Sequence, residues 1–145
     1  MNEINFELPT TDELDYINTE LARFSRKQLP LTTGRTVSLN RVIKVDNQVV
    51  AGIKAQAQWQ EILKISVLWV HADYRGRDYA TALIQEVEQE AIRLGCHVSQ
   101  LSTFEFQARG FYEKMGYQVF GIIENALQGH DRYFLSKRLK KEILL

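Results

Sequence analysis

The sequence predicts an α/β protein built as a three-layer sandwich, and three features of the chain lead to this prediction. Residues 36–70 form a long β-rich stretch with two interruptions typical of turns. Residues 80–91 carry apolar side chains at helical spacing. Beyond residue 95, strand-like runs alternate with a further helical stretch. Helices and strands mixed in this way favour stacked layers of sheet and helix.

The amino-terminal part predicts one short strand followed by one helix. Apolar and polar residues alternate in the predicted strand, with the apolar ones at Ile4, Phe6 and Leu8. Pro9 ends this strand, and Thr10 and Glu13 have the spacing of a capping box. Apolar residues then recur at helical intervals, at Leu14, Ile17, Leu21 and Phe24. We expect this helix to end at about Ser25. Residues 26–35 suit either a second short helix or a mobile loop that walls a substrate site.

The rest of the chain predicts a β-meander and then alternating helices and strands. The meander has three antiparallel strands, at residues 36–45, 49–59 and 62–70. An apolar stripe marks the clearest helix, at Ala80, Leu83, Ile84, Val87 and Ala91. Gly95 can terminate it. The remaining elements are a strand, a helix and two strands, at residues 98–102, 108–115, 117–123 and 132–139. No linker-like composition interrupts the sequence, so we expect a single domain over residues 1–145.

Composition narrows the possible function. The chain has 18 Lys+Arg against 18 Asp+Glu, so its zero net charge gives no general attraction to nucleic acid or to an anionic membrane. Its longest apolar stretch, residues 65–72, is far shorter than the roughly 20 residues of a membrane helix. Cys96 is the only cysteine and cannot form an internal disulfide. We expect a cytoplasmic protein with a small-molecule partner.

The segment most informative about chemistry joins the strand ending at residue 70 to the helix over residues 80–91. The first N–H groups of a helix lack internal partners, and the helix dipole adds about half a positive charge there. Arg75 and Arg77 add two full charges, so we expect an anion site. Gly76 is the only glycine of this turn and no Gly-Lys-Ser/Thr follows it, which disfavours Walker and Rossmann nucleotide loops.

Two motifs follow each other along this half of the chain. Residues 75–80 carry the pattern Arg-x-x-x-x-Ala, and residues 110–117 read Gly-Phe-Tyr-Glu-Lys-Met-Gly-Tyr. Together they resemble the GCN5-related N-acetyltransferase (GNAT) family, over about residues 49–139. The resemblance implies a mixed, mostly antiparallel sheet of about six or seven strands flanked by about four helices. It also implies transfer of an acetyl group from acetyl-CoA to a primary amine by direct attack in a ternary complex.

The same resemblance implies which residues bind acetyl-CoA. Backbone amides of the family's loop grip the pyrophosphate, and this loop corresponds here to Arg75, Gly76, Arg77, Asp78, Tyr79, Ala80 and Thr81. Asp78 replaces the usual glycine; Asp tolerates left-handed geometry better than most residues, but its carboxylate can repel the pyrophosphate. The family also opens its sheet beside Leu68, Trp69 and Val70, whose free N–H groups would pair with the pantetheine arm. Trp69 suits a substrate wall and a packed sheet residue equally well.

The reaction also needs groups that move protons. An alkylamine with a pKa of about 10.4 is mostly protonated at pH 7, and removing its proton costs about 4.6 kcal/mol. The resemblance places Tyr112 beside the thioester sulfur as the acid, and a purely structural aromatic is the alternative. Glu105 is the first choice for the base, ahead of Glu61 and His71. The three histidines show no paired spacing, so no metal site is expected.

Two classes of function stay open from the sequence. One is the enzyme just described, acting on a small-molecule or peptide amine that no motif identifies. The other is a catalytically weak GNAT-fold module that binds acyl-CoA or regulates a partner, with Asp78 impairing catalysis. A nucleic-acid binder is disfavoured because the chain has no basic excess and no aromatic-basic platform. The resemblance also allows a homodimer.

Overall fold

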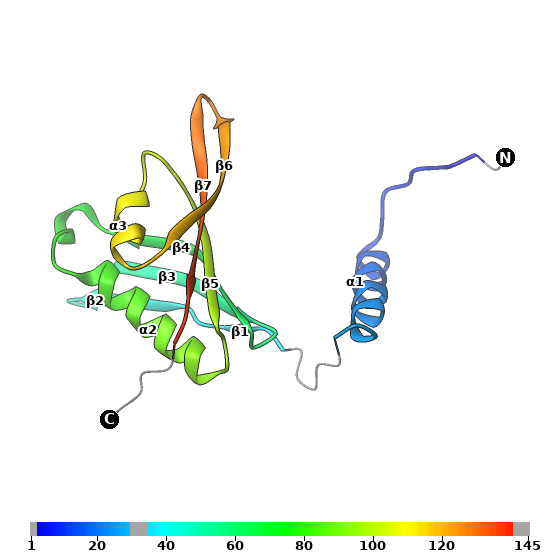
Figure 1. Cartoon of the computed structure of the whole chain (residues 1–145), viewed down its shortest axis with the longest axis horizontal. Helices are drawn as coiled ribbons and strands as arrows, with labels where there is room; N and C mark the ends of the chain where they lie inside the picture. Colours follow the sequence, from blue (N-terminus) through cyan, green and yellow to red (C-terminus); the bar gives the residue numbers. More distant parts are fainter. Residues whose placement is uncertain (1–2, 30–34, 141–145) are drawn as a thin grey trace. The chain divides into compact units, whose positions relative to one another are not determined.

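The computed structural model describes residues 3–29 and 35–140. The chain divides between Thr33 and Gly34 into two compact units, which are described separately (Figure 1). The single-domain organisation expected from the sequence stays a prediction. No helix among the described residues is long and apolar enough to cross a membrane.

The first unit contains helix α1, Thr11–Arg26, and confirms the predicted capping box. The Thr10 amide donates to Glu13 Oε1 at 2.8 Å, and the Glu13 amide donates to Thr10 Oγ1 at 3.2 Å. These two bonds satisfy donors that the first helical turn would leave unpaired. The apolar stripe is solvent-exposed in this unit, at Leu14, Ile17, Leu21 and Phe24.

The predicted first strand is wrong. Residues 3–10 have no regular secondary structure, and the side chains of Ile4, Phe6 and Leu8 are 80%, 94% and 97% exposed. Alternation of apolar and polar residues fits a strand, but a strand also needs a neighbour for its backbone hydrogen bonds. Within the described residues this segment pairs with no other strand. The helix or loop predicted around Pro30 falls largely on residues 30–34, outside the described part of the chain.

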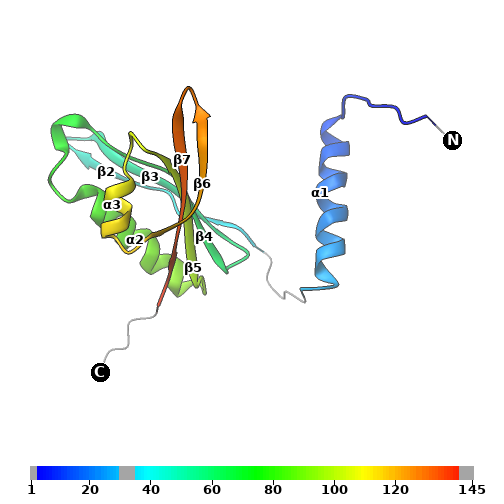
Figure 2. The ribbon, with the colours of Figure 1, turned by 45° about the horizontal axis from the view of Figure 1, so that its top comes forward.

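The second unit is a seven-stranded mixed sheet (Figure 2). Its order is β1-β3-β4-β5-β7-β6, and β2 also pairs with β3. The strands are β1 Val37–Ser38, β2 Arg41–Val45, β3 Gln48–Gln58, β4 Ile62–Val70, β5 Val98–Phe104, β6 Gln118–Leu127 and β7 His130–Arg138. Only β4 and β5 pair in parallel; the other paired strands are antiparallel. The predicted mixed, mostly antiparallel sheet and its meander are confirmed.

The helices of this unit are α2, Tyr79–Arg93, and α3, Arg109–Lys114, with a short 3-10 turn η1, Ala72–Tyr74. With α1, the described residues therefore contain three α-helices rather than the predicted four. Helix α2 packs against β2, β3 and β4 through the predicted stripe, burying Leu83, Ile84, Val87 and Ala91. The only cysteine, Cys96, lies in the same core and is 4% exposed.

The pairing between β4 and β5 stops partway along both strands. The parallel ladder of β4 and β5 holds Ile62–Lys64 against Val98–Gln100 and then ends. From Ile65 onward β4 is paired only with β3 among the described strands. Residues 65–70 of β4 and 101–104 of β5 consequently face an opening between the strands.

A buried polar network joins α2 to β5, β7 and the residue before β6. The Tyr117 hydroxyl donates to Glu88 Oε2 at 2.9 Å and lies 2.8 Å from Ser99 Oγ, so Ser99 must be the donor in that pair. Lys137 Nζ donates to both Glu88 oxygens, at 2.8 and 3.1 Å. Burial and the neighbouring Glu88 carboxylate raise the pKa of Tyr117. Glu88 is 6% exposed, so these partners supply the contacts that water would otherwise make.

Replacing Glu88 by alanine should lower the free energy of unfolding by about 3 kcal/mol, because it leaves the Lys137 ammonium and the Tyr117 hydroxyl without their acceptor. Urea unfolding measures the change. Glu86→Ala on the same helix is the matched control, since Glu86 is exposed and pairs weakly with Arg41 at 3.4 Å. That change should cost less than about 0.5 kcal/mol. Equal losses in the two variants would contradict the structural role of the network.

Candidate active site

The opening between β4 and β5 forms a cleft of about 200 Å³. It is lined by β4, by β5 and by the segment leading into α3, through Ile65, Ser66, Val67, Leu68, Leu101, Ser102, Thr103, Gln107, Ala108 and Tyr112. Successive residues of one strand point to opposite faces of a sheet. Because consecutive residues of both strands line the cleft, side chains from both faces of the sheet border it. The structure thus brings two predicted site residues, Leu68 and Tyr112, to one place.

Tyr112 is held rigidly at the wall of this cleft. Its side chain is 7% exposed and packs edge-to-face against the rings of Phe111 and Tyr117. Its amide donates to the Ala108 carbonyl at 3.1 Å. Burial raises the pKa of the Tyr112 hydroxyl to about 12. The phenol therefore stays protonated at neutral pH and is available as a hydrogen-bond donor.

The loop between β4 and α2 has the left-handed geometry expected of its two turn residues. Gly76 has φ +75°, and Asp78 has φ 64° and ψ 19°. Among the described residues the Asp78 side chain makes no capping hydrogen bond, and the first intrahelical bond runs from the Ala82 amide to the Asp78 carbonyl at 3.0 Å. The amides of residues 79–81 precede that bond and have no intrahelical acceptor. Within the part of the chain that the structure describes, they form a cluster of donors without an acceptor at the positive end of α2.

Both predicted arginines are anchored beside these amides. Arg75 Nε donates to the Val70 carbonyl at 3.2 Å, which ties the loop back to the end of β4. The Arg77 guanidinium lies 4.9 Å from the centre of the Tyr74 ring, and that ring stacks on Tyr79. Within residues 3–29 and 35–140 neither arginine forms an ion pair with a carboxylate. Two cations and the free amides fit a diphosphate at the amino end of α2.

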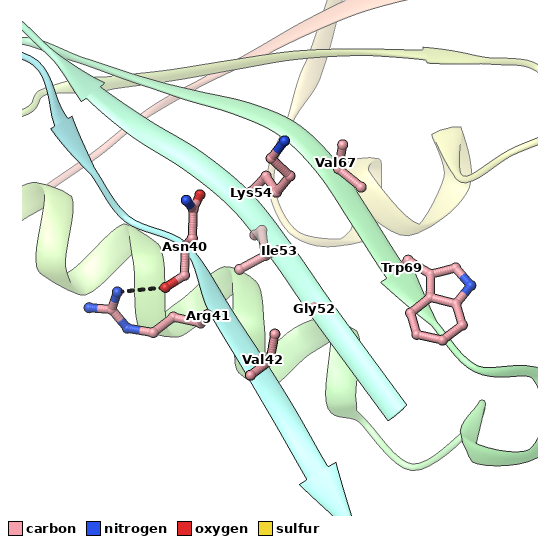
Figure 3. A pocket seen from close by; sticks show the side chains of 8 residues that line it. All are labelled: Asn40, Arg41, Val42, Gly52, Ile53, Lys54, Val67 and Trp69. Carbon is pink, nitrogen blue, oxygen red and sulfur yellow. Dashed lines mark hydrogen bonds between the residues drawn. The ribbon is translucent and has the colours of Figure 1, made fainter. Parts of the chain in front are cut away.

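Trp69 does not line the cleft; it lies in an adjoining groove of about 400 Å³ on the surface of β2, β3 and β4, which shares Val67 with the cleft (Figure 3). Its side chain is 45% exposed and faces the same groove as Val67, Gly52 and Val42. A Cβ added at Gly52 would meet the Val42 side chain at 3.5 Å, an ordinary van der Waals contact, so the groove has room for a small side chain there.

The candidate bases do not line the cleft. Glu105 follows β5, and its Oε1 lies 2.8 Å from His130 Nδ1 at the β6–β7 hairpin. Glu61 lies in the turn between β3 and β4, 2.7 Å from His97 Nε2. The His71 ring accepts a hydrogen bond from the Asp73 amide at 3.0 Å and caps η1. In the described part of the chain, no three potential metal ligands lie together.

Four polar residues of the cleft escaped the sequence analysis: Ser66, Ser102, Thr103 and Gln107. Gln107 Oε1 accepts from the Phe104 amide at 2.8 Å and from Thr103 Oγ1 at 3.2 Å, which fixes the turn into α3. These residues carry no motif in the sequence. Only the end of the β4–β5 ladder, a contact between distant segments, brings them to the cleft.

Comparison with known proteins identifies the family. The model of the acetyltransferase (GNAT) family matches residues 6–117. The chain belongs to this family. A blasticidin-S acetyltransferase from Streptomyces morookaense is 36% identical to this GNAT acetyltransferase over 93 residues, which are 63% of this chain and 68% of the relative.

Solved structures agree with this assignment. The crystal structure of an acetyltransferase from Bacillus cereus ATCC 14579 has a TM-score of 0.84 and 29% identity, covering 94% of this chain and 98% of that one. An aminoglycoside 6'-N-acetyltransferase complexed with coenzyme A has a TM-score of 0.65 at 16% identity, covering 88% and 93% of the two chains. The protein is thus an acetyl-CoA-dependent N-acetyltransferase with an α/β GNAT fold, and its acceptor is an amine.

The left-handed turn before α2 should tolerate only a residue that accepts positive φ. Gly76→Ala should lower the free energy of unfolding by about 1 kcal/mol, because an added Cβ meets no atom within 4 Å and the cost is purely conformational. Gly110→Ala is the control, since a Cβ there also meets nothing but Gly110 lies within α3. That change should raise stability by about 0.5 kcal/mol. Losses of equal size in urea unfolding would contradict the assigned backbone geometry.

Proposed function

We propose that this GNAT acetyltransferase transfers the acetyl group by direct attack of a primary amine in a ternary complex, within the cleft between β4 and β5. The observation that carries this proposal is the end of the β4–β5 ladder, which places the free edge of β4 opposite Tyr112. Acetyl-CoA, when bound, supplies a thioester with a thiolate leaving group. The acceptor is a small-molecule or peptide amine.

Residues 75–81 are proposed to hold the diphosphate of the co-substrate. The free amides of Tyr79, Ala80 and Thr81 point out of the amino end of α2, where the dipole favours an anion. Arg75, Gly76 and Arg77 form the turn before them. Asp78 adds one negative charge, which opposes binding, but two arginines outnumber it. The unpaired edge of Leu68–Val70 supplies backbone groups for the rest of the molecule.

Tyr112 is proposed to donate a hydrogen bond to the sulfur as negative charge develops there. A phenol with a pKa of about 12 binds its proton more tightly than a thiolate whose thiol has a pKa of about 8.5. Full proton transfer from Tyr112 is therefore uphill, and stabilisation by a hydrogen bond suits the geometry better. The burial that raises the pKa also keeps this donor protonated throughout the neutral range.

Glu105 is proposed as the base, acting through water because it does not line the cleft. Its exposed carboxylate is linked to His130, which gives a proton leaving the amine a route to solvent.

Two further proposals concern the surroundings of the enzyme. A cytoplasmic location is supported by the single cysteine, which cannot form an internal disulfide. A homodimer is supported by the edge strand β6, which exposes Phe120, Ile122, Ile123 and Leu127.

Acetyl-CoA at a hundredfold excess over its Kd should stabilise the protein by about 2.7 kcal/mol, seen as a rise in Tm. Arg75→Ala should weaken acetyl-CoA binding about tenfold and reduce that rise, because it removes a cation and the bond to Val70. Arg93→Ala, which removes the same charge from the far end of α2, should leave the rise unchanged. The absence of a thermal shift with either CoA or acetyl-CoA would contradict the diphosphate site.

Tyr112→Phe should lower kcat by about 100-fold while acetyl-CoA affinity stays within about twofold, because only the donor to the sulfur is lost. Release of free thiol measures kcat, and the thermal shift measures binding. Tyr133→Phe is the control, since it keeps the ring that lies against Arg109.

The pH profile gives a second test of this role. The protonated phenol is the active form, and its pKa is about 12, so ionisation of Tyr112 should cause no loss of kcat below about pH 10. An unchanged kcat in Tyr112→Phe would remove this residue from the mechanism.

A further inference from the structure

One face of the β5–β7 ladder carries an arginine that lies close to two aromatic rings. Phe104 lies opposite Arg132 and Ser102 lies opposite Phe134 in this antiparallel pair. Directly opposed residues point to the same face, and so do residues two apart on one strand. These four side chains therefore share one face. The intervening Leu101, Thr103 and Leu135 are buried on the other face.

The position of the Arg132 guanidinium is fixed on three sides. Its Nε and one terminal nitrogen donate to Ser102 Oγ at 3.1 and 2.8 Å. Its central carbon lies 5.0 Å from the centre of the Phe134 ring and 5.9 Å from that of Phe104. A guanidinium carries five N–H donors, so the two hydrogen bonds to Ser102 leave three donors for other acceptors.

The carboxylates next to Arg132 and next to its cross-strand partner Phe104 have other hydrogen-bond partners. Glu105 binds His130, and Asp131 Oδ1 accepts from the Asn125 amide at 2.9 Å. Among the residues that the structure describes, Arg132 forms no ion pair, unlike Arg41 and Arg109. Its charge is thus exposed, pre-oriented and uncompensated. This is the arrangement by which arginine recognises a planar carboxylate through two parallel hydrogen bonds.

Arg132 adjoins the proposed active-site cleft through Ser102. Ser102 lines the cleft together with Tyr112, and its hydroxyl oxygen is 2.8 Å from the guanidinium. Because Ser102 borders the cleft and shares a sheet face with Arg132, an amine inside the cleft can extend toward the guanidinium. A group a few bonds away from the reacting nitrogen would then meet the guanidinium.

We infer that Arg132 binds a carboxylate of the acceptor, so that amines carrying a nearby carboxylate, as amino acids do, are the substrate class. This inference rests on the proposed function, because it places the reacting amine in the β4–β5 cleft. One guanidinium with one hydroxyl matches the single charge of a carboxylate better than a doubly charged phosphate. The same cation repels polyamines, whose second charge would lie near it.

The test compares matched acceptors that differ only in the anionic group: leucine, leucinamide, isopentylamine and the aminophosphonate analogue of leucine, with equivalent sets for other side chains. Thiol release with the full chain gives kcat and KM for each. The wild type should prefer the carboxylate over the amide by about 10- to 100-fold in kcat/KM. Arg132→Gln should abolish this preference through KM, with kcat for the neutral amines unchanged.

Two variants keep the result interpretable. Arg132→Lys retains the charge without the planar fork and should keep only part of the preference. Arg138→Gln removes an arginine from the far end of β7, where it contacts His97, and should change nothing. Thermal unfolding verifies that each variant folds. An equal or greater kcat/KM for amides, or a preference for the phosphonate, would overturn the inference.

Calorimetric titration of the same acceptors in the presence of CoA separates this inference from the proposed function. If no acceptor is acetylated but the carboxylates still bind and Arg132→Gln loses that binding, the transfer chemistry fails and the role of Arg132 stands. If the wild type binds each carboxylate acceptor no more tightly than the corresponding amide, the proposed role of Arg132 is wrong, whatever turnover is measured.

Discussion

The short parallel contact between β4 and β5 forms the cleft in which we propose that the chemistry of this protein occurs. Three residue pairs hold the strands together at Ile62–Lys64, and beyond them the backbone of β4 has a free edge. An unpaired backbone edge inside a domain requires hydrogen-bonding partners, and an extended molecule lying along it can supply them. The strands also position the side chains of the site, since Leu68, Ser102 and Tyr112 meet only because the ladder stops.

The hydrogen-bond donors of the loop before α2 and those of the β4–β5 cleft are held in position in different ways. At the loop before α2 the donors are backbone amides, so their positions depend on the left-handed turn at Gly76 and Asp78 rather than on any side chain. At the cleft the donor is a phenol, fixed by surrounding rings and kept protonated by burial. Glu88, Tyr117 and Lys137 then hold α2 against the sheet. The loop before α2 and the cleft, which we propose to hold the diphosphate and the thioester, are thereby joined by one packed network.

The sequence predicts local features well because their causes are local. The Thr10–Glu13 capping box and the stripe from Ala80 to Ala91 define helices through contacts within a few residues, and both helices are observed. The two motifs likewise lie within short segments, and the roles that they suggest for the loop before α2 and for Tyr112 stay predictions. A strand also depends on its neighbours, which is why the alternation at Ile4, Phe6 and Leu8 predicted a strand that the structure does not contain. The polar lining of the cleft and the Ser102–Arg132 contact escape the sequence for the same reason, since β5 and β7 are distant along the chain.

The buried thiol of Cys96 has a practical consequence. Each turnover of an acetyl-CoA-dependent enzyme releases a free thiol, and reagents that detect this thiol also react with accessible cysteine thiolates of the protein. Burial, with a smaller effect from Glu61, raises the pKa of Cys96, so this residue is poor in thiolate and inaccessible to such reagents. Thiol-detecting reagents should therefore report product alone, without a background from the protein. A second cysteine introduced on the exposed surface could likewise carry a maleimide dye while the native residue is retained.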